Sequence, residues 1–429
     1  MPRTERRAPA RRQSPTSGAT SGASRHEQRP PRRKRPPQNR APQQGKGGQG
    51  RTQPEPVITR APLPPVASFS VLPTDLVRVL NRRGIDDPFP IQSATLPDVL
   101  AGHDVLGRAV TGSGKTLAFG LPLLARLQNG ARGQRRPRAL ILVPTRELAH
   151  QVSDVLAPLG QGIGVRVAVV FGGTSIGRQV DKIGRGIDVL VATPGRLEDL
   201  LARQAVHLDA IETVVLDEAD HLCDLGFLPV MKRLLDLCPP VGQRLLFSAT
   251  LDGDVDVLVR RYLTDPVLVD IAAPEVETEP VVHRLHEVAR REDKPAAVAA
   301  LVRDADRAIV FVRTKHGADR LAKQLSRFDL RTTALHGGMQ QNARTRSLAA
   351  FTDGTAAVLV ATDVAARGLH VDGVDLVVHA DPPTEAKVFA HRSGRTGRAG
   401  ASGEVVTVTL PDEVRDVRKL LAAAQVTAA

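Results

Sequence analysis

A glycine-rich segment, Ala109–Thr116, stands between an apolar run at 104–107 and an apolar stretch of helical type at 117–124. Glycines let backbone N–H groups approach an anion closely, and the start of a following helix adds a favourable dipole. In such a loop Lys115 reaches the β- and γ-phosphates of a nucleotide, and the Thr116 hydroxyl ligates Mg²⁺. The generic motif opens with Gly where this chain has Ala109, so a glycine-rich turn with a solvated lysine is the alternative. We interpret the segment as a phosphate-binding loop.

Two adjacent carboxylates follow the apolar run 214–216. Asp217 is placed to hold Mg²⁺ through its water shell, and Glu218 to orient and deprotonate the water that attacks a phosphate. Together with Asp220, the same residues could instead form an exposed helix cap. Because a phosphate loop lies upstream, we favour the catalytic interpretation.

A third segment, His391–Arg398, carries arginines at positions i, i+3 and i+6. If it belongs to a second domain that closes on the loop, Arg395 and Arg398 can act as arginine fingers on the transition-state charge, an effect of about 10³–10⁵ in rate. A basic helix face that binds a phosphate backbone is the alternative. The spacing does not decide between them.

The composition describes a globular chain with a basic tail. The chain has 429 residues and a net charge of +13, and residues 1–60 alone hold 15 Lys and Arg against three Glu. We expect residues 1–66, which are rich in Pro and Arg, to be disordered. This tail is either an arm that attracts polyanions or a solubilising linker, and we favour the arm.

Cysteine content and hydropathy exclude several classes of protein. Two cysteines, Cys223 and Cys238, rule out a disulfide scaffold and a four-cysteine zinc site. No apolar run approaches the roughly 20 residues of a membrane span, and the N-terminus has no signal-peptide core. A cytoplasmic protein with no membrane partner is therefore expected.

Short apolar, β-branched runs alternate with helix-like segments in two series. The runs are 139–143, 167–171, 187–192, 214–216 and 245–247, then 308–312, 332–335, 357–361, 376–379 and 405–410. Near-continuous apolar strands separated by helices indicate parallel sheets covered on both faces. We predict an α/β protein with two tandem parallel-sheet domains, at 67–273 and 282–429, with a linker at 274–281 and a cleft between them.

Polar clusters follow four strands of the first series, at 144–149, 193–196, 217–220 and 248–250. Ligands of open parallel sheets bind at the carboxyl ends of the strands. One surface of the first domain is therefore expected to collect the chemistry.

Taken together, these segments resemble a DEAD-box RNA helicase over roughly residues 69–410. The resemblance implies two RecA-like domains, ATP and Mg²⁺ as cofactors, and catalysis by Lys115, Glu218, Arg395 and Arg398. Pro90-Ile91-Gln92 is similar to the end of the family's Q motif, which assigns the adenine edge to Gln92 and a stacking contact to Phe69. The implied nucleotide-binding residues are Phe69, Gln92, Thr111, Gly112, Ser113, Gly114, Lys115, Thr116, Asp217 and Gly368. Those that couple hydrolysis to strand separation are Asp220, Ser248, Thr250 and His391.

The same resemblance implies contacts to the sugar-phosphate backbone of RNA. The implied contact residues are Pro144, Thr145, Arg146, Gly172, Gly173, Thr193 and Arg196 in the first domain, and Arg313, Gln341, Arg344 and Thr362 in the second. Backbone contacts carry no base sequence, so we expect sequence-independent binding of single strands and short duplexes. A monomer is expected, and ribosomal-precursor and RNA-decay assemblies are the open candidates for its partners.

The chain departs from the family pattern at a few positions. Phe89 stands where Thr or Ser is usual, Ile85 where Phe is usual, His370 where Asp is usual, and Phe389 where Tyr is common. Histidine can still hydrogen-bond a ribose hydroxyl. We therefore expect relaxed preference among nucleotides and not a loss of hydrolysis.

The function expected is RNA-stimulated ATP hydrolysis coupled to local, non-processive unwinding of RNA or remodelling of RNA–protein complexes. A DNA helicase or translocase is one alternative, against which Asp220 and Gln92 argue. An RNA-binding clamp that uses ATP only to lock in place is another. Intact Glu218, Arg395 and Arg398 argue against the clamp.

Overall fold

The computed structural model describes residues 59–109, 113–128, 130, 133–251, 253–271, 281–366, 373–397 and 402–426. Several expectations fall outside these residues. They concern the basic tail up to residue 58, most of the 274–281 linker, and Thr111, Gly112, Gly368, His370 and Arg398. The two sheets described below belong to one compact unit, Pro56–Ala429.

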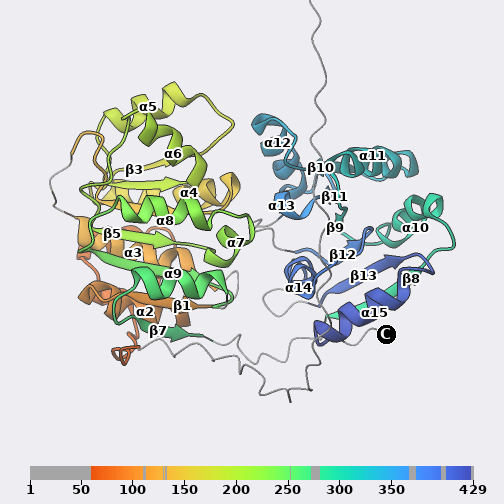
Figure 1. Cartoon of the computed structure of the whole chain (residues 1–429), viewed down its shortest axis with the longest axis horizontal. Helices are drawn as coiled ribbons and strands as arrows, with labels where there is room; N and C mark the ends of the chain where they lie inside the picture. The colour runs from red at the N-terminus through yellow and green to blue at the C-terminus, as the bar shows by residue number, and fades with distance from the viewer. Residues whose placement is uncertain are drawn as a thin grey trace, which may run out of the picture. The chain divides into compact units, whose positions relative to one another are not determined.

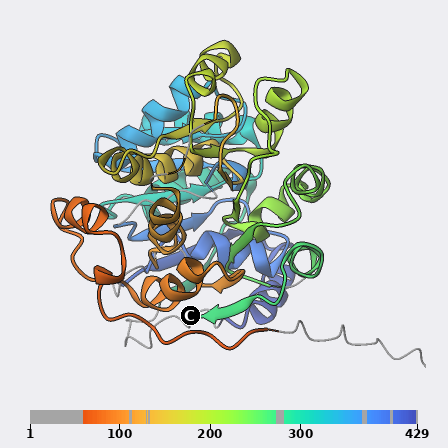
Figure 2. The same ribbon diagram turned by 90° about the vertical axis from the view of Figure 1, so that its left-hand side faces the viewer.

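The first sheet has seven parallel strands in the order β3-β4-β2-β5-β6-β1-β7 (Figure 1). These strands are β1 (Val105–Arg108), β2 (Ala139–Leu142), β3 (Val167–Val170), β4 (Val189–Ala192), β5 (Thr213–Leu216), β6 (Gln243–Ser248) and β7 (Val267–Asp270). Every residue of β2, β4, β5 and β6 is buried, as expected for strands covered on both faces. Strand β7 forms one edge (Figure 2).

Helices divide between the two faces of this sheet. One core cluster contains residues of η1 (Phe69–Val71), α1 (Thr74–Asn81), α2 (Pro90–Ala101), α3 (Lys115–Leu127) and α4 (Arg146–Gly162). The other contains residues of α5 (Ile176–Gly184), α6 (Pro194–Ala202), α7 (Ala219–Asp224), α8 (Leu228–Asp236) and α9 (Asp254–Tyr262). Successive strand residues alternate between the clusters, as the pleat requires: Val105 faces the first and Leu106 the second.

The second sheet has six parallel strands in the order β10-β11-β9-β12-β13-β8. They are β8 (Val282–Glu287), β9 (Ala308–Phe311), β10 (Thr332–Leu335), β11 (Val358–Ala361), β12 (Leu376–His379) and β13 (Glu404–Thr409). Buried residues of α10 (Lys294–Leu301) and α11 (Lys315–Leu325) pack on one face. Those of α12 (Gln341–Thr352), α13 (Asp363–Ala366), α14 (Ala386–Ser393) and α15 (Val414–Ala423) pack on the other. Two short 3-10 helices, η2 (Arg291–Asp293) and η3 (Ser326–Phe328), complete this part.

Two parallel sheets confirm the predicted fold class. Each of the ten predicted runs corresponds to a strand whose ends differ by no more than two residues. The prediction misses the edge strands β7 and β8. In β7 buried and exposed residues alternate, and no residue of β8 is fully buried, so neither strand has a continuous apolar sequence.

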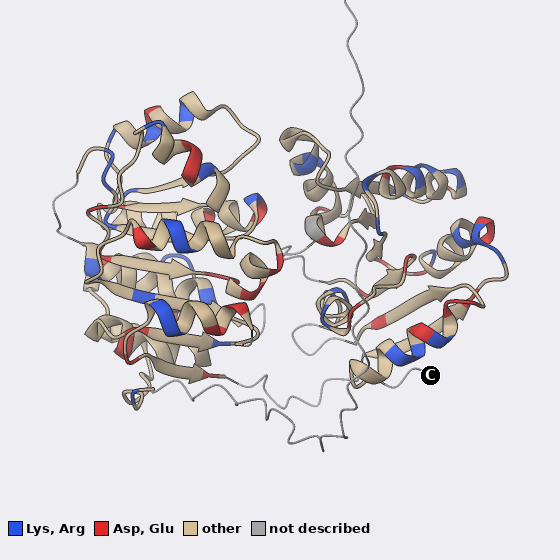
Figure 3. Ribbon diagram, viewed as in Figure 1, with Lys and Arg blue, Asp and Glu red and all other residues tan. Residues whose placement is uncertain are grey.

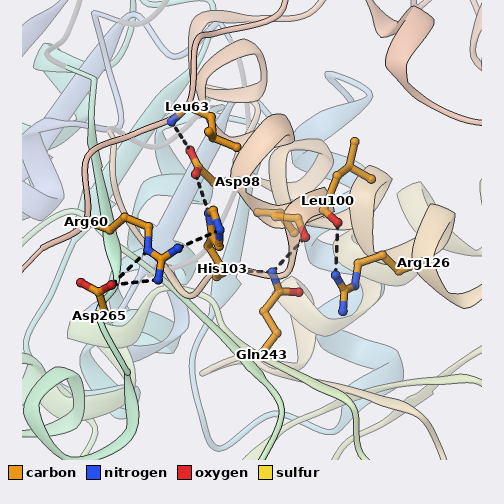
Figure 4. Close-up of polar contacts among 9 residues, drawn as sticks. Arg60, Leu63, Asp98, Leu100, His103, Arg126, Gln243 and Asp265 are labelled. Atoms are coloured by element: carbon orange, nitrogen blue, oxygen red, sulfur yellow. Dashed lines mark hydrogen bonds and ion pairs between the residues drawn. The ribbon is translucent and has the colours of Figure 1, made fainter.

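Polar side chains join the start of the described chain to the amino-terminal ends of the strands (Figure 4). Arg60 donates to Asp265 at 2.9 Å and contacts His103 Nε2 at 3.0 Å, and His103 Nδ1 contacts Asp98 at 2.9 Å. Gln243 Nε2 donates to the His103 carbonyl at 2.7 Å. This network lies at the end of the sheet opposite the predicted chemistry.

Both cysteines are free thiols. Burial raises the pKa of Cys223 to about 12 and that of Cys238 to about 11, so neither is a reactive thiolate at neutral pH. None of the helices in the described ranges is long and apolar enough to cross a membrane.

Candidate active site

The described part of the phosphate loop joins β1 to α3, as predicted. Gly114 has φ of +89°, and a Cβ there would lie 2.4 Å from Gln92 Nε2 and 2.9 Å from Phe89 Cδ2. Only glycine fits this turn. Lys115 begins α3, and its Nζ donates to the Ala109 carbonyl at 2.9 Å. The ammonium is therefore held back over the loop, where a bound phosphate would lie.

Gln92, on α2, forms a hydrogen bond with this loop. Its Oε1 accepts from the Phe89 backbone N–H at 3.0 Å, and its Nε2 donates to the Gly114 carbonyl at 3.1 Å. The amide therefore already touches the phosphate loop.

The two phenylalanines near this site differ in exposure. Phe69 is 2% exposed and belongs to the hydrophobic core, so its ring presents no open face for stacking. Phe89 is 56% exposed and lies against Gly114. The sequence analysis noted Phe89 only as a departure from a pattern, although an aromatic residue three positions before Gln92 was a usable signal.

The carboxylates follow β5, next to β6 in the sheet. Glu218 adopts φ of +51° and ψ of +53°, a left-handed conformation that is uncommon for a residue with a side chain and is concentrated at functional sites. The Glu218 N–H donates to Asp217 Oδ1 at 3.0 Å. This tight turn places the two acids side by side at the carboxyl end of the strand.

Burial acts on the two acids with different outcomes. It raises the pKa of Asp217 to about 7, against the opposing charge of Lys115. Burial also tends to raise the pKa of Glu218, but a hydrogen bond from His221 and nearby positive charges outweigh it and lower that pKa to about 2. Glu218 is therefore a carboxylate at neutral pH, as a general base must be.

His221 was not identified from the sequence. Its Nδ1 lies 3.0 Å from Glu218 Oε2, with both side chains largely buried. Its Nε2 is buried and has no hydrogen-bond partner among the described residues. His221 Nδ1 is therefore placed to donate its hydrogen bond to the Glu218 carboxylate. Its position three residues after Glu218 at the start of a helix was the available signal.

Three of the four residues expected to couple hydrolysis to strand separation meet at the carboxyl ends of β5 and β6, whereas the fourth, His391, lies on α14. The Asp220 N–H donates to Ser248 Oγ at 3.2 Å, and Thr250 Oγ1 donates to Asp220 Oδ2 at 3.4 Å. Asp220 and Ser248 are 4% and 0% exposed. The structure thus links the two segments directly, through buried hydrogen bonds.

The residues present fit a magnesium-bound nucleotide. Ser113 Oγ is buried with no hydrogen-bond partner among the described residues, and Asp217 Oδ2 receives no hydrogen bond from them. No cluster of three or more His, Cys, Asp or Glu side chains in the described ranges could hold a metal. An ion here would therefore rely on Asp217, the Thr116 hydroxyl, water and phosphate oxygens, which are the ligands Mg²⁺ prefers.

The RNA-contact residues of the first sheet gather after β2, β3 and β4. Thr145 caps α4 by accepting from the Leu148 N–H at 3.2 Å, which places Arg146 in the first turn. Gly173 has φ of +83°, and a Cβ there would lie 2.2 Å from Arg146 Nη1. Arg196 is 8% exposed, and its Nη1 has no hydrogen-bond partner among the described residues. Such an unmet donor suits an incoming anion.

The corresponding residues of the second sheet follow β9, β10 and β11. Arg313 is exposed two residues after the end of β9, and Thr362 directly follows β11. In α12, Arg344 Nε donates to Glu147 Oε1 at 2.8 Å, and Gln341 Oε1 accepts from Arg146 at 3.0 Å. The RNA-contact residues expected on α4 and α12 therefore meet directly.

Two described arginines of the His391–Arg398 segment, Arg392 and Arg395, have different roles. Arg392 forms an ion pair with Asp363 and donates to the Asp381 carbonyl at 2.8 Å, so it holds α14 against the sheet. Arg395 lies just beyond α14, after His391, and its charge contributes to the lowered pKa of Glu218.

Comparison with known proteins places the chain in a family. Residues 89–258 match the model "DEAD/DEAH box helicase", and residues 293–400 match "Helicase conserved C-terminal domain". The chain is 41% identical over 363 residues to DEAD-box ATP-dependent RNA helicase 53 of Oryza sativa subsp. japonica, covering 82% of this chain and 59% of that protein. It is 38% identical over 350 residues to the helicase CshA of Bacillus subtilis, covering 81% and 70%.

Solved structures agree with this comparison. Dbp5 of S. cerevisiae bound to RNA and ADP BeF3 superposes with a TM-score of 0.72 at 28% identity, covering 84% of this chain and 93% of that chain. The chain spans less than two thirds of the length of the rice relative. By these matches, the chain belongs to the DEAD/DEAH box helicase family.

Proposed function

We propose that this chain is an ATP-dependent RNA helicase that couples RNA-stimulated ATP hydrolysis to local, non-processive unwinding or remodelling. One observation carries the proposal. The phosphate loop with Lys115, the Asp217–Glu218 pair and Arg146 at the start of α4 all lie at the carboxyl ends of the strands of one sheet. The names of relatives as RNA helicases, and of a solved neighbour as bound to RNA, support it.

The roles follow from the geometry. Lys115 neutralises phosphate charge, and Glu218, held ionised by His221, takes the proton from the attacking water. Asp217 and Thr116 would hold the magnesium ion, which supplies charge neutralisation at the phosphates. Arg395, with Arg398 beyond the described residues, supplies cations to the transition state from a second domain. In this proposal the domains span 67–273 and 282–429, with the 274–281 linker and a cleft between them.

Turnover measured with poly-RNA, with poly-DNA and with no polymer tests this function. We expect the RNA polymer, and not the DNA polymer, to stimulate ATP turnover. Equal stimulation by DNA would favour a DNA translocase, and ATP-dependent RNA binding without turnover would favour a clamp. Arg395→Gln is expected to lower RNA-stimulated kcat by about 10³-fold, whereas Arg291→Gln, an exposed site, leaves it unchanged. Unaltered turnover in Arg395→Gln would contradict the proposed role of the second domain.

Nucleotide preference depends on Phe89 in this proposal. The exposed ring beside Gln92 and Gly114 can stack on a base, which buried Phe69 cannot. Because the chain has no Trp, Phe89→Trp introduces a single tryptophan whose fluorescence can be followed. We expect ATP to quench it, while Phe328→Trp, at an exposed site in the second sheet domain, stays unchanged. Equal responses of both reporters would contradict this role.

The remaining assignments belong to the same proposal. We propose a cytoplasmic monomer that acts on ribosomal-precursor or RNA-decay assemblies. The name of one relative, from Arabidopsis thaliana, is mitochondrial, so cell fractionation is the direct check of location. Crosslinking and sequencing of bound RNA would identify the target.

A further inference from the structure

The outer face of α11 carries a row of cations. The helix buries Ala318, Leu321, Ala322 and Leu325 against the second sheet. The exposed residues His316, Arg320, Lys323 and Arg327 follow at intervals of four, three and four, which places them along one side of the helix and its 3-10 extension η3. Blue bands along α11 mark its basic residues in Figure 3.

The three strong cations of this row are Arg320, Lys323 and Arg327. Within the described part of the chain, they form no ion pair and no side-chain hydrogen bond. Asp319, the acidic residue of α11, contacts His336 Nε2 at 2.9 Å instead. On α15, by contrast, Lys419 pairs with Asp416 at 3.0 Å. The row on α11 therefore keeps its charge available for an external anion.

The row continues from residues expected to contact RNA. Arg313 directly precedes Thr314, the N-cap of α11. The stem of Lys315 packs at the 336–338 turn, since a Cβ on Gly338 would lie 3.3 Å from Lys315 Cδ. Arg344 Nη1 donates to the His336 carbonyl of the same turn at 3.2 Å. The cations of α11 thus begin beside Arg313 and adjoin the turn that Arg344 contacts.

An exposed aromatic ring ends the row. Phe328, the last residue of η3, is 37% exposed and directly follows Arg327. Proteins that bind single strands without sequence preference combine a cationic track for the phosphates with aromatic rings on which bases stack. Phe328 supplies such a ring next to the cations of α11.

We propose that the row formed by His316, Arg320, Lys323, Arg327 and Phe328 binds an unpaired RNA segment that flanks the central contact. The cations contact phosphates, and the Phe328 ring stacks on a base. From residue 316 to residue 327 the helical rise gives about 16 Å, or roughly five stacked nucleotides. The inference rests on the proposed RNA binding and adds a second, adjoining segment to it.

Charge neutralisation with a matched control tests the proposal. In the full chain, Arg320, Lys323 and Arg327 are replaced by Gln together. The control replaces Arg415, Arg418 and Lys419 of α15, which are also exposed, carry the same total charge and lie in the same sheet domain. The dissociation constant is measured for oligo(U) of increasing length at several salt concentrations. The log–log salt slope should fall by about 2 for the α11 variant and stay unchanged for the control.

Length and aromatic contacts give separate readouts. For wild type, affinity should keep rising over about five nucleotides beyond the length at which the α11 variant levels off. Phe328→Ala should weaken binding of the longer oligonucleotides about tenfold without altering the salt slope, because it removes stacking and no charge.

The outcomes separate this inference from the proposed function. RNA binding by wild type with the same salt slope and length profile in the α11 variant overturns the inference alone. Equal losses in both triple variants assign the effect to overall charge and also overturn it. Absence of any RNA binding by wild type overturns the inference and the proposed function together.

Discussion

Two buried aspartates of the first sheet, Asp104 and Asp217, show how the same residue type serves opposite purposes at the two ends of parallel strands. Asp104 precedes β1, and its two oxygens accept backbone N–H groups of Arg244 and Thr264, each at 2.7 Å. Asp217 follows β5 and accepts one such bond, from Glu218. Burial raises the pKa of both.

The difference lies in how completely each carboxylate is satisfied. Asp104 joins β1 to β6 and to the segment before β7 through these two hydrogen bonds, so its carboxylate holds strands together. Among the described residues, Asp217 accepts no hydrogen bond at its second oxygen, at the edge where Lys115 and Ser113 also lie. A buried charge without its full set of partners costs stability but remains ready for a cation. Within this sheet, the carboxylate at the amino-terminal ends of the strands stabilises the fold, and the carboxylate at their carboxyl ends remains available for chemistry.

The largest effect is expected at Glu218. Glu218→Gln keeps the shape of the side chain but removes the base, so RNA-stimulated kcat should fall by about 10³-fold. Nucleotide binding measured by equilibrium titration should persist. Glu198→Gln, at a half-buried carboxylate on α6 that pairs with Arg233 away from the site, is the control. Substantial residual turnover in Glu218→Gln would assign the base elsewhere.

Asp217→Asn should stabilise the nucleotide-free and magnesium-free fold. The folded pKa of Asp217 is about 7 and its ordinary value is 3.8, so the folded state binds more protons between these values. Wild-type stability should therefore fall as pH rises from about 4 to 7, by roughly 2 to 4 kcal/mol, and then level off. Urea unfolding at several pH values measures this. A parallel fall in Asp217→Asn would show that other groups cause it.

His221 should affect turnover and not ATP affinity. His221→Leu removes the donor to Glu218 and should lower kcat about tenfold with KM for ATP unchanged, whereas His221→Asn, which retains an N–H donor, should restore most of it. In the Glu218→Gln background, His221→Leu should add no further loss, because it acts through Glu218. Additive losses would show a separate role.

Substitution of Asp104 should lower the stability of the fold and leave turnover unchanged. Asp104→Asn retains one of the two backbone acceptors, so the free energy of unfolding in urea should drop by about 1 to 2 kcal/mol. RNA-stimulated kcat at a temperature where the variant is folded should equal that of wild type. A lower kcat with unchanged stability would reverse the proposed division between the two ends of the sheet.

Much of the fold and the chemistry could be predicted because both depend on local sequence. Apolar runs such as 139–143 and 308–312 have to be buried, and the turn at Gly114 admits no side chain. The predictions failed where the signal was weak. The edge strands β7 and β8 are partly exposed, so their residues do not form apolar runs.

The sequence by itself determined two parallel-sheet domains and the residue types for phosphate chemistry, because hydrophobic patterning and short motifs are local properties. Tertiary structure alone decided which side chains are buried and which are exposed. It buried Phe69 and left Phe89 open, paired His221 with Glu218, and gave the strong cations of α11 no partner among the described residues. The physical reason is that exposure and pairing depend on neighbours brought together by packing, which spacing along a chain does not specify.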